Sequence, residues 1–223
     1  MRRKKMVCFF LALLLVSTIG CSIQNGDVYD RAEQKDIVNV IYETISPDWL
    51  MYKSATELVD ACDRVVLGTV TDISFQVLDI RTGKVPEDNI DDLYCYLYTI
   101  YDIDIVETYK GDQRSHEQVR IIGGLEDIQI DEQIEALGQN PVTIFILEDM
   151  VDISKGETYL FMLAQFDDSL PTIANVEQSI YNISEALSNE TGQSGAITIQ
   201  EIVKCFGANE WKNMYNIAQE LIS

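Results

Sequence analysis

The chain has 223 residues, 47% of them hydrophobic and 24% charged, so it can bury one core of ordinary size. Its 37 acidic and 16 basic residues give a formal net charge of −21 at pH 7. A surface this acidic repels phosphate backbones and anionic lipid headgroups, which excludes nucleic-acid binding.

The first twenty residues are predicted to be an export signal. Residues 2–5 are Arg-Arg-Lys-Lys, and an unbroken apolar run follows over residues 6–16. This order is typical of a secretory signal peptide. The run is shorter than the roughly 20 apolar residues that a membrane-spanning helix needs. We therefore expect residues 1–20 to be removed during export.

Residues 18–22, Thr-Ile-Gly-Cys-Ser, resemble the lipobox of bacterial lipoproteins. In that family the cysteine thiol receives a diacylglyceryl group and the cysteine becomes the first residue of the mature chain. Gly20 fits the motif, whereas Thr18 stands where the family usually has leucine. The resemblance implies that Cys21 is lipidated and that its acyl chains hold the protein on the outer face of the cell membrane. The alternative is an ordinary secretory signal followed by a cysteine by chance.

The segment 21–53 is predicted to be a tether followed by a helix. Apolar residues recur at helical spacing between Val28 and Ile45, after Asp27 as a cap. The sequence Ser46-Pro47 ends this segment. Ser54 and Glu57 then have the spacing of a capping box, which predicts a short helix before the next element.

From residue 64 onward the apolar pattern becomes that of strands. Apolar residues alternate over 64–77 and 93–105, which predicts two long strands with one buried face each. The segments 142–147 and 158–166 are apolar on both faces, which indicates interior strands. Further strands are expected at 119–122, 172–176 and 180–183, with a helical turn at 132–137.

The C-terminal part returns to a helical pattern. Residues 198–201, Thr-Ile-Gln-Glu, have the form of a capping box and predict a helix that ends near Gly207. From Trp211 onward, apolar residues fall on one face of a last helix. That stripe must pack on another part of the protein to be shielded from water.

Three segments resemble the strand pattern of netrin-like modules, which include the tissue inhibitors of metalloproteinases. They are residues 61–70 (ACDRVVLGTV), 101–111 (YDIDIVETYKG) and 156–161 (GETYLF). Uncharacterised lipoproteins of Gram-positive bacteria with the same spacing and a closing helix are similar too. The resemblance covers about residues 55–183 and implies an OB-type β-barrel. It implies no inhibitory residue, because the zinc-chelating N-terminal cysteine of those inhibitors has no counterpart once Cys21 is acylated.

The strands alone favour a barrel or sandwich, since they do not alternate regularly with helices. With the resemblance, the predicted fold is mainly β (α+β), a small OB-like antiparallel β-barrel with N-terminal and C-terminal helices. The predicted organisation is a signal peptide (1–20), a tether and N-terminal helix (21–53), the OB-like barrel (54–184), and a linker with C-terminal helices packed on the barrel (185–223).

The sequence shows no catalytic arrangement and no cofactor-binding motif. His116, the only histidine, lies in a polar run and is interpreted as a solvated loop residue, with a catalytic histidine as the alternative. Cys62, Cys95 and Cys205 have no CxxC spacing, which favours buried thiols over a disulfide framework. A hydrolase or thiol enzyme that uses one of these cysteines is the less favoured interpretation.

Two side-chain groups are candidate binding features. The loop at 87–92 is acidic, and Asp88, Asp91 and Asp92 are weak calcium candidates, although the loop lacks the EF-hand spacing and a solvated acidic loop is favoured. Tyr94, Tyr96 and Tyr98 alternate and therefore share one strand face. That face could bind a sugar or a partner protein, but packing under the Trp211 helix is favoured.

Together these patterns favour a membrane-anchored, extracytoplasmic binding or interaction module of unknown ligand. The expected partner is the membrane itself, reached through the lipid on Cys21. The alternative is a structural or assembly lipoprotein whose partner is another envelope protein.

Overall fold

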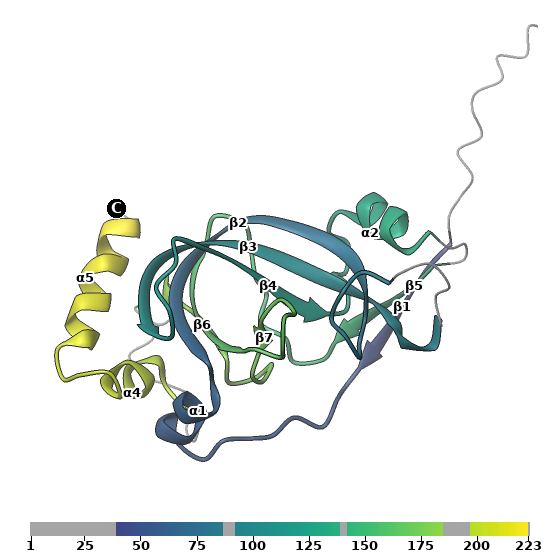
Figure 1. Cartoon of the computed structure of the whole chain (residues 1–223). Helices are drawn as coiled ribbons and strands as arrows, with labels where there is room; N and C mark the ends of the chain where they lie inside the picture. Colours follow the sequence, from purple (N-terminus) through teal and green to yellow (C-terminus); the bar gives the residue numbers. More distant parts are fainter. Residues whose placement is uncertain (1–38, 87–91, 139–141, 185–196, 223) are drawn as a thin grey trace, which may run out of the picture. The chain divides into compact units, whose positions relative to one another are not determined.

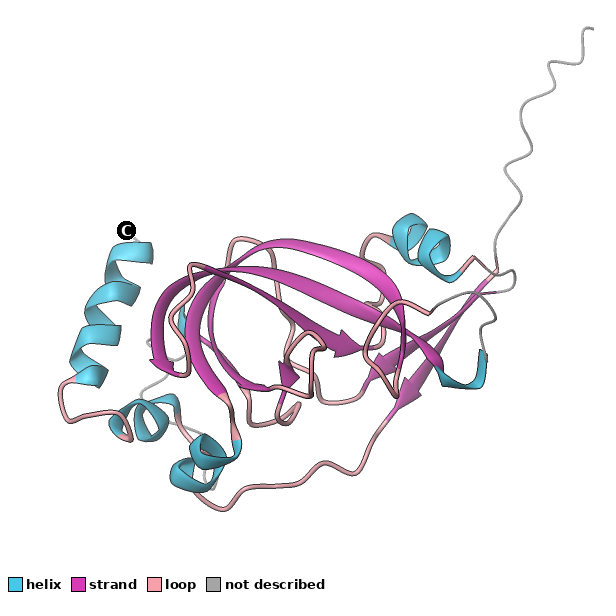
Figure 2. Ribbon diagram, viewed as in Figure 1, coloured by secondary structure: helices cyan, strands magenta, loops and turns pink. Residues whose placement is uncertain are grey.

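The computed structural model describes residues 39–86, 92–138, 142–184 and 197–222, and most of its regular structure is β (Figures 1 and 2). The strands are β1 (Val40–Ile45), β2 (Arg64–Asp79), β3 (Cys95–Lys110), β4 (His116–Ile122), β5 (Val142–Leu147), β6 (Thr158–Ala164), β7 (Thr172–Ile173) and β8 (Ile180–Asn182). The helices are α1 (Ala55–Ala61), α2 (Ile130–Leu137), α4 (Ile199–Lys204) and α5 (Glu210–Ile222), with a 3₁₀ turn, η1, at Asp92–Tyr94. The predicted mainly β class is confirmed.

An antiparallel six-stranded sheet contains the two long strands that the period of two predicts. Its order is β4-β3-β2-β6-β7, and β8 also pairs with β6. The pairing of β2 with β3 shifts register between Leu67 and Gly68. A Cβ atom on Gly68 would lie 2.3 Å from Cγ2 of Ile103, so the close approach of the two strands requires glycine there.

The six-stranded sheet is not closed into a barrel. No strand ladder joins its outer strands β4 and β7 within the described residues. The two edges do meet at one point, where the backbone N–H of Arg120 donates to the carbonyl of Pro171 at 2.9 Å. Strand β7 begins directly after this proline and is only two residues long. The hydrogen bond therefore does not continue into a strand ladder.

A separate two-stranded sheet corrects two predictions. Residues 40–45 belong to the predicted N-terminal helix but form β1, which pairs in parallel with β5. The segment is rich in β-branched and aromatic residues, and pairing with β5 decides its structure over the helical spacing. Strand β5 is therefore not an interior strand of the large sheet. It is apolar because Val142 and Ile144 are buried with Ile134 and Leu137 of α2.

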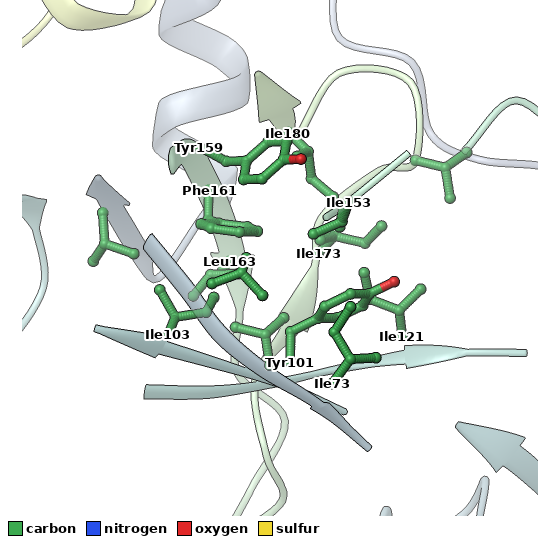
Figure 3. Packing of buried hydrophobic residues seen from close by; sticks show 14 of the residues in the cluster. Ile73, Tyr101, Ile103, Ile121, Ile153, Tyr159, Phe161, Leu163, Ile173 and Ile180 are labelled. Atoms are coloured by element: carbon green, nitrogen blue, oxygen red, sulfur yellow. The ribbon is translucent and has the colours of Figure 1, made fainter. Parts of the chain in front are cut away.

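Both faces of the large sheet are covered where β2 pairs with β6. Alternation places Val66 and Phe161 in one buried cluster (Figure 3) and Val65 and Leu160 in another. The second cluster includes buried residues of α1, α4 and α5, and α1 and α4 lie side by side (Figure 1). The C-terminal helices thus pack on the sheet, as the apolar stripe of the last helix predicts.

The helix starts follow the predicted caps. The Ser54 hydroxyl accepts a hydrogen bond from the backbone N–H of Glu57 at the start of α1. At α4, Thr198 and Glu201 form the complete capping box. Hydrogen bonds from the backbone and hydroxyl of Thr198 hold the pKa of Glu201 below its usual value. None of the described helices is long and apolar enough to cross a membrane.

Candidate functional site

A cavity of about 460 Å³ opens at one end of the large sheet. The end of β2 and the turn after it form one wall, β4 forms another, and parts of the segment 166–173 form a third. Trp49, Tyr98 and Leu147 complete the lining. The volume is typical of sites for small organic molecules.

Arg120 on β4 is the central polar residue of this cavity and is only 7% exposed. Its Nε donates to the carbonyl of Leu170 at 2.9 Å, and its Nη2 donates to Oγ of Ser169 at 3.1 Å. The guanidinium lies 5.5 Å from the centre of the Tyr98 ring. These neutral groups stabilise the cation without neutralising it.

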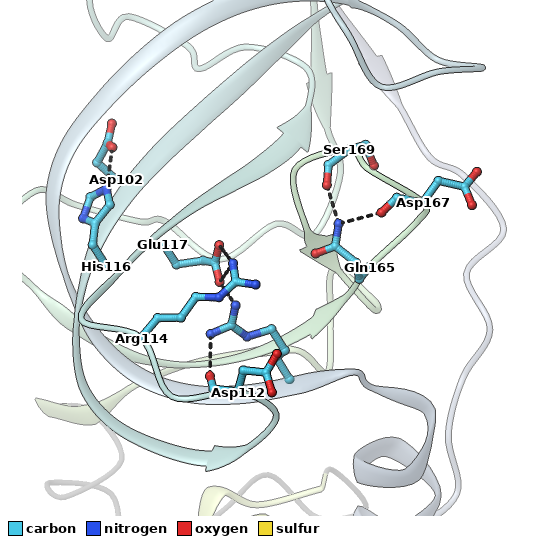
Figure 4. A network of polar contacts seen from close by, with 9 residues as sticks. Asp102, Asp112, Arg114, His116, Glu117, Gln165, Asp167 and Ser169 are labelled. Atoms are coloured by element: carbon cyan, nitrogen blue, oxygen red, sulfur yellow. Dashed lines mark hydrogen bonds and ion pairs between the residues drawn. The ribbon is translucent and has the colours of Figure 1, made fainter.

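Arg120 differs from the other buried charged residues of the described structure, which are Arg64, Asp79 and Glu117. Arg64 pairs with Glu117, and Asp79 pairs with Arg81. Figure 4 shows Arg114 against the same Glu117 carboxylate. Arg120 alone among them has no carboxylate partner within the described residues. A buried charge without a counter-ion is costly, so a cation held in this way beside a cavity indicates a binding site.

Arg81 lies at the mouth of the same cavity but its charge is offset. Its Nε donates to Oδ1 of Asp79 at 3.0 Å, and the guanidinium lies 4.1 Å from the centre of the Tyr94 ring. The Arg81 hydrogen bonds hold the pKa of Asp79 below its ordinary value. The cationic character of the cavity therefore comes from Arg120.

Trp49 reaches the cavity from the segment that links β1 to α1. This segment is held by the loop after β7: Asn175 Nδ2 donates to the carbonyl of Leu50 at 2.9 Å, and Gln178 exchanges two hydrogen bonds with the backbone of Tyr52. The indole Nε1 of Trp49 is buried and has no acceptor among the described residues. An unsatisfied buried donor is uncommon in folded proteins.

The chemistry of the lining favours binding over catalysis. The Ser169 hydroxyl donates to the carbonyl of Phe166 at 2.6 Å and accepts from Arg120, so it has no base to activate it. Isoleucine and leucine side chains from β4, β5 and β7 supply apolar walls. A buried cation beside apolar and aromatic groups can hold and orient a small molecule.

The three tyrosines of the predicted strand face lie in three different environments. Tyr94 is 41% exposed in η1, Tyr96 is half-buried beside Phe145, and Tyr98 is buried and lines the cavity. The prediction that the Trp211 helix covers this face is wrong. That helix packs instead through Met214 and Ala218 into the apolar cluster that also contains buried residues of α1 and α4.

His116 is not a loop residue, as the sequence suggested, but the first residue of β4. Its ring is half-exposed, with Nε2 3.1 Å from Oδ1 of Asp102 (Figure 4). Its Nδ1 lies 3.3 Å from Oδ1 of Asp104. The pairing of β4 with β3 brings these side chains to one sheet face. Each ring nitrogen lies next to one of these carboxylates. Neither contact includes a nucleophilic side chain.

The cysteines differ in exposure. Cys62 is buried and donates to the Leu58 carbonyl at 3.1 Å, Cys95 is half-buried, and Cys205 is exposed. Burial raises the pKa of the Cys62 thiol to about 12. The neutral thiol therefore stabilises the fold below its ordinary pKa of 9.0, and this contribution is lost as the pH rises toward 12. A thiol held in this state is a poor nucleophile.

We expect iodoacetamide at mildly alkaline pH to modify Cys205 much faster than Cys62 in the folded protein. The reason is that the thiolate is the reacting form, and Cys62 is both buried and protonated. Peptide mapping by mass spectrometry measures the two rates, and both residues should react in denaturant. Equal rates in the folded protein would contradict the burial of Cys62.

The other predicted sites lie outside the described residues. Cys21, Asp88 and Asp91 are in undescribed segments, and for Asp92 only the backbone is described. Within the described part of the chain, no group of three or more histidine, cysteine or acidic side chains is arranged to hold a metal ion.

The sequence predictions do not include Arg120 or Trp49. Arg120 carried a usable signal, since it is a basic residue between Val119 and Ile121 in a predicted strand. Such a residue must find partners or open onto a cavity. Trp49 carried no comparable signal, because only tertiary hydrogen bonds bring its segment to the cavity.

Comparison with known proteins adds no family. No family model matches the chain. No curated protein matches it at a significant level.

Proposed function

We propose that the protein is an exported binding module that takes a small ligand into the cavity around Arg120. One observation carries this proposal: Arg120 is a buried cation without a carboxylate partner among the described residues, and it lines a cavity of ligand size. An arginine kept for stability alone is expected to be paired, as Arg64 is with Glu117. A ligand that enters the cavity would supply the missing partner.

The OB-type barrel is part of the proposal. An OB-fold is a five-stranded, partly open Greek-key barrel. Strands β2, β3, β4, β6 and β7 would be its five strands, and the hydrogen bond from Arg120 to Pro171 would mark its closing edge. The resemblance of residues 61–70, 101–111 and 156–161 to netrin-like modules supports the same assignment. In this arrangement the ligand would enter where the barrel closes.

Purification of the full chain from a membrane fraction tests the binding function. In mild nonionic detergent, the wild-type protein should carry a small molecule that native mass spectrometry resolves as an added mass. We expect Arg120→Met to lose most of it, and Lys155→Met to keep it, because Lys155 lies outside the cavity in an exposed ion pair with Asp72. The proposal would be contradicted if the wild type carried no added mass, or if Arg120→Met carried the added mass in equal abundance.

We also propose that a lipid on Cys21 places this module on the outer face of the membrane. Support comes from the export signal at 1–20 and from the lipobox resemblance of residues 18–22. Two or more acyl chains give stable anchoring, whereas one chain gives only marginal binding. The anchor would keep the cavity at the membrane surface, where an envelope protein could also contact the module.

Labelling of growing bacterial cells with radioactive palmitate tests the anchor. The wild-type chain and Cys205→Ser should be labelled, because Cys205 belongs to helix α4's C-terminal end and is not part of the lipobox. Cys21→Ser should be unlabelled and released from the membrane fraction. Label that persists in Cys21→Ser, or that is missing from the wild type, rules the anchor out.

A further inference from the structure

We infer that the ligand of the Arg120 cavity is a monocarboxylate with an apolar or aromatic body. The inference rests on the proposed function, since it concerns the same cavity. It follows from three properties of the lining: one cation without a counter-ion, apolar walls, and a second donor without an acceptor.

The charge of the ligand follows from the charge of the site. Three charged side chains line the cavity: Arg81, which is paired with Asp79; Asp167, which is exposed; and Arg120, with which no described carboxylate forms an ion pair. One remaining positive charge matches one negative charge. A phosphate dianion would place a second charge in a site whose other cation, Arg81, is already paired with Asp79, inside a chain of net charge −21.

The geometry of Arg120 fits a carboxylate in particular. Leu170 and Ser169 accept from Nε and Nη2, so they occupy one side of the guanidinium. No described protein atom accepts a hydrogen bond from Nη1. The N–H groups on this remaining side match the two oxygens of a carboxylate, which arginine binds with two parallel hydrogen bonds.

The turn after β2 holds the guanidinium in place. Gly83 in this turn has a φ of +64° and lies so close that a Cβ atom on it would be 2.5 Å from Nη1 of Arg120. Arg120 is therefore enclosed between this turn, Ser169 and the Tyr98 ring. A positioned arginine loses little freedom when it binds an anion, which favours selective binding.

The apolar body of the ligand follows from the walls. Ile121, Ile122 and Ile173 line the cavity beside Arg120, and Phe166 lies at its rim with 61% of its surface exposed. A ligand with an aromatic or alkyl group would bury Phe166 and remove apolar area from water. A small inorganic anion would leave these walls in contact with water.

Trp49 offers the second polar contact. Its Nε1 has no acceptor, and the indole lines the same cavity. Because Nε1 is buried, a rotation of the ring is needed before a ligand oxygen can accept from it. Binding should therefore change the environment of Trp49, which makes its fluorescence a direct report on the cavity.

The test uses three matched probes: phenylacetate, its neutral amide phenylacetamide, and phenyl phosphate. The full chain is studied in nonionic detergent in the Trp211→Phe background, so that Trp49 is the remaining tryptophan. Calorimetry gives the affinities, and Trp49 fluorescence shows that the probe is in the cavity. We expect phenylacetate to bind about tenfold or more tightly than either the amide or the phosphate.

Two variants assign the difference to the guanidinium. Arg120→Met keeps an unbranched apolar stem but removes the guanidinium, and it should reduce phenylacetate affinity about tenfold or more, to the level of the amide. Lys155→Met, the control outside the cavity, removes the cation of an exposed ion pair with Asp72 and should change it less than about threefold. If Arg120→Met does not fold, the comparison of acid with amide on the unchanged protein still decides the role of charge.

The outcomes separate the ligand class from the proposed function. The inference that the ligand is a carboxylate is overturned if the amide or the phosphate binds as tightly as phenylacetate and changes Trp49 fluorescence. In that case the cavity remains a binding site. Phenylacetate binding that is unchanged in Arg120→Met, or no binding of phenylacetate, also overturns the inference. The binding function itself falls only if native mass spectrometry finds no Arg120-dependent ligand.

Discussion

Replacing Glu117 with glutamine is expected to lower the free energy of unfolding by about 3 to 5 kcal/mol, the usual cost of breaking a buried ion pair. Arg64 and Glu117 are both 5% exposed, and their side chains form an ion pair. Arg114 reaches the same carboxylate at 3.2 Å. Glutamine keeps the shape but leaves the buried Arg64 charge without compensation, and Arg64 Nε already lacks an acceptor among the described residues.

Urea unfolding followed by circular dichroism measures this loss for Glu117→Gln. The matched control is Asp72→Asn, which removes one partner of the ion pair between Asp72 and Lys155. Both side chains of that pair are more than half exposed, so the control should leave stability nearly unchanged. If Glu117→Gln unfolds at the same urea concentration as the wild type, the buried pair does not exist in solution.

The second large effect is expected at Phe161, whose replacement by alanine should cost about 3 to 5 kcal/mol. Phe161 is completely buried on β6, and its ring lies 5.7 Å from that of Tyr159 at an angle of 50°. Figure 3 shows it in one cluster with Ile103 of β3 and Ile173 of β7. The loss combines the transfer of the ring to water with the cavity that remains.

Phe166→Ala is the matched control, because the same substitution is made at a ring that is 61% exposed. Its effect on the free energy of unfolding should be less than about 1 kcal/mol. Thermal unfolding of both variants under one condition gives the comparison. Equal losses at the two positions would show that Phe161 is not in the core.

The regular elements could be predicted because each has a local cause in the sequence. The alternation of apolar residues predicts β2 and β3, and the capping patterns at Ser54 and Thr198 predict the starts of α1 and α4. These signals depend on neighbours within a few residues. They are therefore readable without knowledge of the tertiary structure.

Strand β1 could not be predicted because its structure depends on a distant partner. The spacing of Val38, Ile41 and Ile45 fits a helix, and only the pairing with β5, about one hundred residues away, makes residues 40–45 a strand. The position of α5 is a similar case, since its apolar stripe requires a cover but does not specify which surface provides it.

The candidate site could not be predicted either, because it also depends on residues that are distant in the sequence. Trp49, Arg81, Arg120 and Ser169 belong to four separate segments, and the sheet brings them together. The sequence directed attention to Tyr94, Tyr96 and Tyr98, of which the cavity uses only Tyr98. What distinguishes Arg120 is the absence of a carboxylate beside it in the described structure, and no sequence pattern records such a property.

A nitrogen–proton correlation spectrum of the arginine guanidinium groups, recorded while phenylacetate is added, tests the role of Arg120 most directly. The account predicts that the Arg120 signals move in a saturable manner, because the carboxylate would accept hydrogen bonds from the guanidinium. The signals of Arg64, which is already paired with Glu117, should stay in place. Arg120 signals that do not move, or that move no more than those of Arg64, would contradict the assignment of this cavity as a site for carboxylates.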